Sequence, residues 1–467
     1  MASATSRQKV VLLNPPGDQR YLRDYFCAKV AKSYYYYHPI DLVYISGTIS
    51  VDFDVEFIDA IAEGLSAQAC KNKIAAAQPD WVLFLTAGIS FVQDMAFLED
   101  LKVAVPTASL IGIGDVYREI GEAGLRDHAF VDALLLDFST QDIITYLRGE
   151  RGKAIPNLIY RDDDAILNGK EVHGRGRFHL PMPRWDLVKL PLYRYPFERR
   201  REFASMITDF GCAFKCTFCP LSTVGFKLRD LEEVEKELKL LKGMGVREIY
   251  FRDQTFGTNR KRTLDLCAIL KPLGLGWTCF SRVDVLTEDL LVAMKGSGCH
   301  TVMFGFETAN DEILAAYDKN TSTIQADQAV ALCRSYGIDV VGFFIIGLPG
   351  ESRESVLATI DFACKSGIDF ASFNMAVPRL GSTMRKDAIE AGTSDQAITD
   401  VDSSNSQPSW KGQSLSNQEI VELQKIAFRK FYLRPSYILK RLRRIATPHQ
   451  LWSMVREGIF LVGRKAA

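Results

Sequence analysis

The sequence predicts an α/β protein: an N-terminal Rossmann-like doubly wound parallel sheet, a partial (β/α)6 TIM-type barrel and a C-terminal helical region. Apolar runs of strand length alternate with helical patterns over residues 1–150 and again over 204–385, and such alternation is typical of parallel sheets covered by helices. The second series has about six strand–helix units, too short for a complete eight-fold barrel of about 250 residues. The length, 467 residues, suits about three domains.

The first domain, residues 1–150, begins with a buried strand that ends at two prolines. Its apolar runs do not alternate with polar residues, which indicates strands buried on both faces. Ligands of such sheets bind at the carboxyl ends of the strands. The predicted strands are Lys9–Asn14, Val51–Asp59, Trp81–Gly88, Ala108–Gly114 and Val131–Asp137. The predicted helices are Gly64–Ala77, Val92–Val103, Val116–Leu125 and Gln141–Arg148.

Residues 151–203 lack this rhythm and are punctuated by prolines. We expect a linker that packs across two domains, with a small hairpin at Arg161–Val172.

The second domain, residues 204–385, carries the barrel pattern. Its predicted strands are Ala204–Phe210, Arg247–Asp253, Trp277–Val283, Thr301–Glu307, Asp339–Gly347 and Asp369–Val377. Its predicted helices are Leu231–Lys242, Asn259–Leu270, Thr287–Lys295, Thr323–Tyr336 and Ser352–Ser366.

The last region, residues 386–467, combines a polar loop over 392–415 with helical patterns at Asn417–Leu433, Ser436–Ile445 and His449–Val462. From Lys425 onward eleven Lys or Arg residues face one acidic residue, Glu457. A basic amphipathic helix can lie at an anionic membrane surface. The alternative is a helix that covers the barrel and pairs with its acidic surface, with Arg stems packed on apolar groups.

Composition limits the function classes. The chain has 57 Lys+Arg and 57 Asp+Glu, whereas a nucleic-acid binder should show a basic excess, so we expect no nucleic-acid partner. The N-terminal apolar run is too short for a signal peptide, and no run is long enough to span a membrane. Ten cysteines are not the density of a disulfide scaffold. We expect a cytoplasmic protein, with peripheral membrane contact through the basic tail as a further expectation.

Three cysteines stand within eight positions: Cys212, Cys216 and Cys219, spaced C-x3-C-x2-C. They follow the first barrel strand, which places them at the carboxyl mouth of the barrel. Thiolates are ligands of iron–sulfur clusters, and three thiolates leave one of four irons open to a small molecule. The alternatives are a structural zinc loop, which normally needs a fourth ligand, and buried core cysteines.

The cysteine loop, with the aromatic Phe218 before the third cysteine, resembles the signature of the radical S-adenosylmethionine (SAM) superfamily. The resemblance implies that Cys212, Cys216 and Cys219 hold a [4Fe–4S] cluster whose open iron binds SAM. An electron from the cluster then cleaves SAM, and the resulting 5′-deoxyadenosyl radical abstracts hydrogen from the substrate. An external donor such as flavodoxin or ferredoxin is implied.

The same resemblance implies SAM contacts along the barrel. It places Asp253 at the methionine moiety, Arg282 at the carboxylate and Glu307 at the ribose hydroxyls or the amino group. Further implied contacts are Phe218, Ile346 in the segment that borders adenine, and the backbone near Val377. A guanidinium suits a carboxylate because it can bind it in bidentate fashion. The alternatives are an ion pair between Arg282 and Glu307 and a helix cap at Asp253.

The N-terminal domain resembles the cobalamin (B12)-binding domain of one branch of the superfamily. The resemblance rests on the Asn-Pro-Pro turn and on Pro79–Ser90, and implies cobalamin contacts at Thr86, Ser90 and Gly114. The D-x-H-x-x-G motif, whose histidine ligates cobalt in many members, is absent from the sequence. The aromatic segment Arg23–Pro39 is interpreted either as lining a cofactor or substrate face or as an insertion packed on the sheet.

Three hypotheses follow. The first is a radical SAM enzyme that functionalises an unactivated C–H position as a cobalamin-dependent C-methyltransferase. The second is a radical SAM cyclase or rearrangement enzyme of lipid, pigment or natural-product biosynthesis with a degenerate cobalamin domain. The third is a non-catalytic iron–sulfur or zinc scaffold, which the SAM-contact positions disfavour. The expected substrate is a small or lipid-like molecule.

Overall fold

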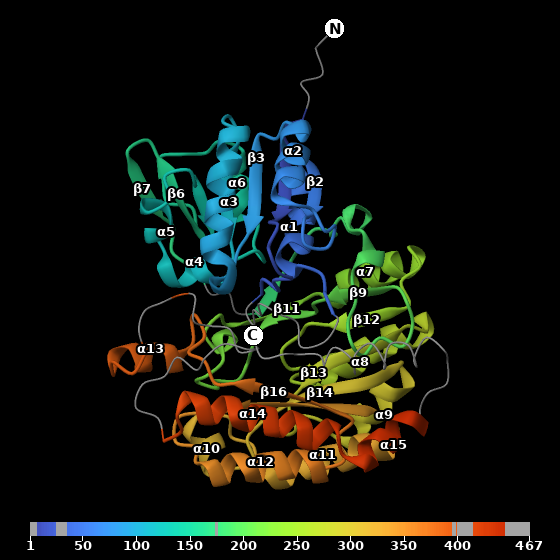
Figure 1. The fold of residues 1–467 in the computed structure, drawn as a ribbon. Helices are drawn as coiled ribbons and strands as arrows, with labels where there is room; N and C mark the ends of the chain where they lie inside the picture. The colour runs from blue at the N-terminus through green and yellow to red at the C-terminus, as the bar shows by residue number, and fades with distance from the viewer. Residues whose placement is uncertain (1–6, 25–34, 173–175, 395–397, 399–413, 444–467) are drawn as a thin grey trace.

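The computed structural model describes residues 7–24, 35–172, 176–394, 398 and 414–443. Two α/β bodies are stacked, with the N-terminal sheet above the barrel sheet and the C-terminal helices at the far side of the barrel (Figure 1). The polar loop expected over 392–415 and the last predicted helix, His449–Val462, lie mainly or wholly outside the described residues.

The N-terminal body is a seven-stranded sheet in the order β2-β1-β3-β4-β5-β6-β7. The first five strands are parallel, and β6 and β7 add an antiparallel hairpin, with Leu134 opposite Ile159 at the junction. Its strands are β1 (Lys9–Asn14), β2 (Asp54–Asp59), β3 (Trp81–Leu85), β4 (Ser109–Ile113), β5 (Ala133–Leu135), β6 (Leu158–Asp162) and β7 (Ala165–Asn168). The hairpin that we expected inside the linker therefore belongs to this sheet.

Helices cover both faces of this sheet, as a doubly wound fold requires. Strand residues alternate between the two faces, so Val10 and Leu12 pack with α1 and α6 while Val11 and Leu13 pack with the other helices. The helices are α1 (Ile40–Ser50), α2 (Ala67–Ala77), α3 (Phe91–Ala104), α4 (Asp115–Ile120), α5 (Ala123–Arg126) and α6 (Asp142–Leu147). Helix α1 was not predicted, because its nine central residues are all buried and show no polar face.

The segment between the two bodies packs against both. Trp185 is fully buried and donates from Nε1 to Oε1 of Glu237 in the barrel helix α7 (Leu231–Gly243) at 2.8 Å. The backbone N–H of Arg184 donates to the hydroxyl of Ser46 on α1 at 2.9 Å. A short strand, β8 (Gly176–Phe178), joins β10 (Asp209–Gly211) and β11 (Phe226–Arg229) in a small sheet.

The barrel body is a parallel six-stranded sheet in the order β16-β15-β14-β13-β12-β9, with its two edges unjoined. The partial (β/α)6 barrel is thus confirmed. The strands are β9 (Phe203–Met206), β12 (Glu248–Phe251), β13 (Gly276–Ser281), β14 (Cys299–Glu307), β15 (Asp339–Ile346) and β16 (Phe370–Met375). Its further helices are α8 (Arg260–Leu270), α9 (Glu288–Gly296), α10 (Asp311–Ala316), α11 (Thr323–Ser335), α12 (Arg353–Lys365) and α13 (Thr383–Glu390).

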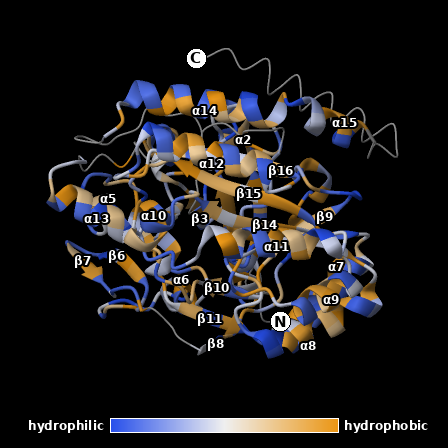
Figure 2. Ribbon diagram, turned by 90° about the horizontal axis from the view of Figure 1, so that it is seen from below, coloured by the Kyte–Doolittle hydropathy of each residue, from blue (hydrophilic) through white to orange (hydrophobic). Residues whose placement is uncertain are grey.

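Two C-terminal helices, α14 (Asn417–Tyr432) and α15 (Pro435–Arg443), run past the edge strand β16 with hydrophobic and hydrophilic residues interleaved (Figure 2). The Tyr432 hydroxyl accepts from the backbone N–H of Ala371 at 3.1 Å and donates to its carbonyl at 2.6 Å. The Gln424 amide donates to the carbonyl of Phe373 at 3.0 Å. Side chains of α14 therefore form hydrogen bonds with backbone groups on the free edge of β16, which would otherwise lack partners. Across the described residues, no helix has the length and apolarity needed to cross a membrane.

Candidate functional site

The cysteine loop lies at the carboxyl end of β9 and is fixed by backbone hydrogen bonds. Cys212 donates its N–H to the carbonyl of Gly225 at 3.0 Å. Thr217 donates to the carbonyl of Tyr317 at 3.1 Å and accepts from the N–H of Met384 at 2.9 Å. These contacts tie the loop to distant parts of the barrel, so its conformation is set by the fold.

All three thiols, together with Phe218, line one cavity of about 610 Å³ inside the partial barrel. Burial raises the pKa of Cys219 to about 12, helped by the charges of Cys212 and Cys216. Coordination to a metal deprotonates such a thiol outright. The described residues hold no group of three or more His, Cys, Asp and Glu side chains placed around a single metal ion. A four-iron cluster binds each thiolate through a different iron, so three thiols around one shared space fit it.

Arg282 follows β13 and is 5% exposed. Its Nη1 lies 3.4 Å from the sulfur of Cys216, and Nη2 donates to the carbonyl of Lys319 at 2.7 Å. Asp284 holds the guanidinium at two points, 3.0 and 2.9 Å, and the ring of Phe214 lies 3.8 Å from its central carbon. Arg282 is therefore a fixed cation beside the cysteine loop.

Glu307 lies at a β-bulge, where the register between β14 and β15 shifts. Its φ is 64°, in the left-handed region, and the bulge turns the carboxylate back over Gly305. A Cβ on Gly305 would meet Oε1 of Glu307 at 2.2 Å and Nζ of Lys319 at 3.0 Å. Only glycine leaves room here for the ion pair between Glu307 and Lys319, whose N···O distance is 2.9 Å. Bulges beside active sites commonly re-aim a side chain in this way.

Lys319 is 6% exposed and lines the same cavity, yet the sequence did not reveal it. Burial works to lower its pKa, but the charges of Glu307 and Cys216 raise it above the usual value. The residue follows α10 in a loop rather than a strand, so strand ends did not point to it. The alternative interpretation, an ion pair between Arg282 and Glu307, is not what the structure shows: Arg282 pairs with Asp284, and Glu307 pairs with Lys319.

Two of the residues predicted to contact SAM, Asp253 and Ile346, do not line the cavity. The carboxylate of Asp253 accepts from the N–H and hydroxyl of Thr208, both at 2.6 Å, and from the N–H of Asp209 at 3.2 Å. Asp253 thereby fixes the turn after β9 and is not among the cavity-lining residues. Ile346 packs in the core, whereas its neighbour Ile345 lines the cavity, because successive strand residues face opposite sides. Val377 lines the cavity as expected.

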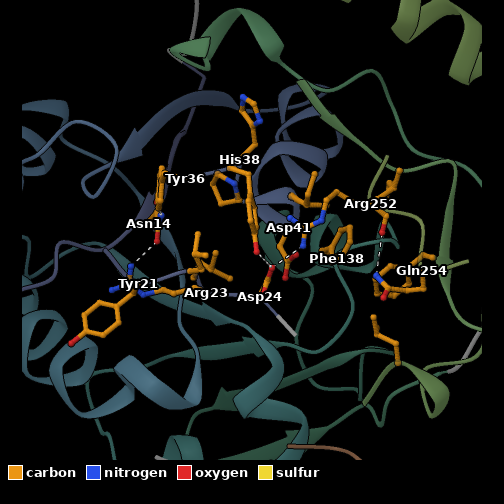
Figure 3. A pocket seen from close by; sticks show the side chains of 18 of the residues that line it. Asn14, Tyr21, Arg23, Asp24, Tyr36, His38, Asp41, Phe138, Arg252 and Gln254 are labelled. Atoms are coloured by element: carbon orange, nitrogen blue, oxygen red, sulfur yellow. Dashed lines mark hydrogen bonds and ion pairs between the residues drawn. The ribbon is translucent and has the colours of Figure 1, made fainter. Parts of the chain in front are cut away.

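A second, smaller cleft of about 60 Å³ lies between the N-terminal sheet and the barrel (Figure 3). Its lining includes Asn14 and Leu85 at strand ends of the sheet, and Asp41, Phe138 and Asp209. Asn14 and Leu85 mark the carboxyl edge of the N-terminal sheet, where ligands of such folds bind, and Asp209 of β10 faces this edge from the other side of the cleft.

Buried carboxylates gather at this edge. Burial raises the pKa of both Asp41 and Asp115 to about 7, and the charge of Asp24 adds to the effect. One oxygen of Asp115 and one of Asp209 have no hydrogen-bond partner among the described residues. Unpartnered buried acceptors are rare in native structures, so this edge is suited to a ligand that donates hydrogen bonds.

The aromatic segment before α1 forms a wall between the two spaces. Tyr35 and Tyr37 line the barrel cavity, whereas Tyr36 and His38 line the cleft, and Tyr37 reaches both. The ring of Tyr37 lies 4.3 Å from the guanidinium carbon of Arg252, which also faces both spaces. Because successive residues of this segment face opposite sides, the segment separates the barrel cavity from the cleft. Residues 25–34 of this segment lie outside the described residues.

Arg252 joins the two bodies at this wall. Its guanidinium pairs with Asp24 from the N-terminal body at 2.7 Å, and Asp24 also accepts from the Tyr37 hydroxyl at 3.2 Å. Wall residues from both bodies are thus held together by one ion pair.

The three residues predicted to contact cobalamin already make close contacts within the N-terminal body. The hydroxyls of Thr86 and Ser90 both donate to Oδ2 of Asp94 at 2.7 Å, and Asp94 forms a fully buried pair with Arg23 at 2.6 Å. Gly114 has φ 146°, and a Cβ there would lie 1.9 Å from the carbonyl oxygen of Thr86. Gly114 thus allows the close approach of the chain segments after β3 and β4.

His38 is the cleft-lining histidine among the described residues. Its Nδ1 accepts from the N–H of Ser205 at 3.2 Å, its ring stacks on Tyr193 at 4.1 Å, and its Nε2 has no described partner. Burial, with the charge of Arg252, lowers its pKa to about 3.

The fold and the cysteine site define a radical SAM protein, and comparisons with known proteins agree. Residues 206–363 match the radical SAM superfamily. An uncharacterized methyltransferase of Pyrococcus horikoshii is 31% identical over 419 residues, which cover 86% of this chain and 89% of that protein. The chain belongs to the radical SAM superfamily and is an enzyme that uses a [4Fe–4S] cluster and SAM.

Solved structures share the whole fold. The radical S-adenosylmethionine methyltransferase TsrM from Kitasatospora setae, solved with cobalamin and a [4Fe–4S] cluster bound, has a TM-score of 0.68 at 16% identity, with 98% of this chain and 99% of that chain covered. The cobalamin-dependent S-adenosylmethionine radical enzyme OxsB has a TM-score of 0.69 at 14% identity, covering 97% of this chain and 72% of that chain. At these identities the likeness describes the fold.

Proposed function

We propose that the protein is a cobalamin-dependent radical SAM C-methyltransferase. The observation that carries the proposal is the shared wall: Tyr37 and Arg252 face both the cysteine-lined cavity and the cleft at the carboxyl edge of the N-terminal sheet. A carbon atom positioned at this wall would be reached from both sides. When bound, the cluster would supply the electron that cleaves SAM, and cobalamin would carry the methyl group.

The chain's own residues have separable roles in this proposal. Arg282, fixed by Asp284, offers donors to the carboxylate of SAM, and Glu307 accepts from its hydroxyl or ammonium groups. Phe218 and Val377 supply apolar surface in the same cavity. Aromatic side chains of the lining, such as Phe280 and Phe343, would exclude water from the reacting atoms.

Cobalamin binding is the less direct half of the proposal. The unpartnered carboxylate oxygens of Asp115 and Asp209 suit a ligand rich in amide donors. The cleft as it stands holds about 60 Å³, so a corrin ring requires the two bodies to move apart. Thr86 and Ser90 would act by fixing Asp94, which pairs with the cleft-lining Arg23, and Gly114 would act by its backbone.

The test uses anaerobically purified enzyme with a reconstituted cluster, with and without hydroxocobalamin. We expect cobalamin to co-elute on gel filtration and S-adenosylhomocysteine to form from SAM only when cobalamin is bound. Formation of 5′-deoxyadenosine and methionine alone, independent of cobalamin, would favour the cyclase or rearrangement alternative.

A companion measurement concerns the cobalt ligand. We expect no histidine below the cobalt, so the electron paramagnetic resonance of the reduced, bound corrinoid should show no nitrogen coupling. His38→Gln should leave that spectrum unchanged. A nitrogen coupling in the wild type that disappears in His38→Gln would contradict the expectation and identify His38 as the ligand.

The electron donor and the membrane contact are also proposals. An external flavodoxin or ferredoxin would reduce the cluster. The exposed apolar residues Ile438, Leu439 and Leu442 of α15, interleaved with basic ones, support a peripheral membrane contact. Co-sedimentation with anionic liposomes, compared between the full chain and a chain that lacks residues 436–467, tests it: equal partitioning would leave the covering-helix interpretation.

A further inference from the structure

The barrel cavity runs along the strands rather than across their ends. On β15 the lining residues are Val341, Phe343 and Ile345, and Leu348 continues the wall beyond the strand. From Val341 to Ile345, at about 3.3 Å per residue, the strand part of this wall extends for roughly 13 Å. A complete barrel of this type is filled by packed side chains, whereas here an elongated hollow lies along the inner face.

The two ends of the hollow differ in chemistry. Its polar groups, among them the three thiols, Glu307 and Lys319, gather at the carboxyl ends of the strands. Toward the amino end of β16 the wall is aromatic or aliphatic, with Tyr195, Phe197 and Phe370. This apolar part of the cavity, called the tunnel below, leads away from the reacting end.

Small inward residues keep the middle of this tunnel open. On β16, Phe370, Ser372 and Asn374 alternate toward the cavity. Serine between two larger side chains leaves a gap that a phenylalanine would fill. A larger side chain at position 372 would therefore block the tunnel without touching the cysteine loop.

A cation, the guanidinium of Arg441, lies at the end of the tunnel that is remote from the cysteine loop. Arg441 of α15 lines the cavity, and its guanidinium carbon lies 4.3 Å from the centre of the Phe370 ring. No described Asp or Glu lies within ion-pair distance of Arg441, whereas its neighbour Lys440 pairs with Asp369 at 2.9 Å. A half-buried guanidinium beside an apolar tunnel is suited to bind a carboxylate or phosphate.

We infer that the substrate is an elongated, mostly apolar molecule with an anionic group at the end remote from the reacting carbon. The inference rests on the proposed function, because it assigns the tunnel to the substrate of the same reaction. The apolar chain lies against Phe343 and Phe370, and the anionic group pairs with Arg441. A fatty acid and a prenyl phosphate share this chemistry.

The test measures binding without turnover, on the full chain with its cluster and SAM, so that it is independent of methyl transfer. The fluorescent fatty acid cis-parinaric acid is titrated, and geranylgeranyl phosphate and uncharged geranylgeraniol are used as competitors. We expect Arg441→Gln to weaken cis-parinaric acid and geranylgeranyl phosphate at least tenfold while geranylgeraniol changes less than twofold. The stronger of the two anions identifies the source of the anionic group.

Two further variants complete the design. Ser372→Phe should weaken all three probes at least tenfold, and Lys425→Gln, which removes an exposed positive charge from α14, should weaken none. Cluster absorbance and circular dichroism verify that each variant is folded. Equal binding by wild type, Arg441→Gln and Ser372→Phe, or no saturable binding of any probe, overturns the inference. Tight binding without cobalamin-dependent S-adenosylhomocysteine would instead leave the ligand class of the tunnel standing and overturn the methyltransferase proposal.

Discussion

The two ligand spaces of this protein are built in opposite ways. The barrel cavity is open at about 610 Å³, and its charged groups point inward from fixed positions such as Arg282. The cleft of the N-terminal sheet holds about 60 Å³, and the hydroxyls of Thr86 and Ser90 are already occupied by Asp94. The barrel is therefore preorganised for its cofactors, whereas the cleft has to widen before a large ligand can enter.

Loss of a loop cysteine should have the strongest effect, and this effect should be confined to the barrel cavity. Replacement of Cys212, Cys216 or Cys219 by alanine should abolish cluster absorbance and SAM cleavage, because a four-iron cluster loses one of its protein ligands. Cobalamin co-elution should persist in these variants. Cys364→Ala, at a half-buried cysteine of α12, is the matched control and should behave as wild type. A variant that cleaves SAM after loss of a loop cysteine would overturn the cluster assignment.

A tenfold to hundredfold effect is expected from Arg282→Gln. Loss of one charge-assisted contact costs about 1.5–3 kcal/mol of binding, which isothermal titration with SAM on the cluster-loaded enzyme measures. The cluster potential should also fall, because a donor near the Cys216 sulfur is lost. Arg260→Gln removes an exposed pair with Asp289 and serves as the control. Unchanged SAM affinity in Arg282→Gln would remove this residue from the SAM pocket.

The smallest effect is a pH dependence of stability confined to the cleft. The pKa of Asp41 is raised from 3.8 to about 7 by burial and by Asp24 and Asp115, with Arg252 opposing. Between those two pH values the folded state keeps a proton that the unfolded state releases, so the free energy of unfolding falls as pH rises and levels off above about 7. Each pKa unit corresponds to about 1.36 kcal/mol.

Asp41→Asn should therefore reduce this slope by at most about 1.36 kcal/mol per pH unit, the contribution of one proton, as measured by denaturant unfolding of the cofactor-free protein from pH 4 to 8. The exposed Asp54→Asn is the control. A wild-type slope that Asp41→Asn leaves intact would assign the pH dependence to other groups. Bound cobalamin should reduce the slope if it donates hydrogen bonds to these carboxylates.

The sequence predicted what depends on local pattern. The positions of most strands along the chain followed from apolar runs, and the cysteine loop followed from its C-x3-C-x2-C spacing. It did not predict α1, because a helix buried on all sides has no periodic polar face. Lys319 was missed because its loop looks like any surface loop until Glu307 turns back over Gly305. The sequence pointed to Ile346, whereas its neighbour Ile345 lines the cavity, because the sequence does not say which side of a strand faces the hollow.

The hydroxyl of Tyr432 bonds both the N–H and the carbonyl of Ala371, and this has a consequence for solubility. An open barrel leaves its last strand free to recruit a strand from another molecule, which is a route to aggregation. Helix α14 occupies the place that a seventh strand would take, and Gln424 extends the same protection to Phe373. A chain that ends before residue 417 should therefore self-associate. Helix α14 thus prevents the open edge of β16 from pairing with a strand of another molecule.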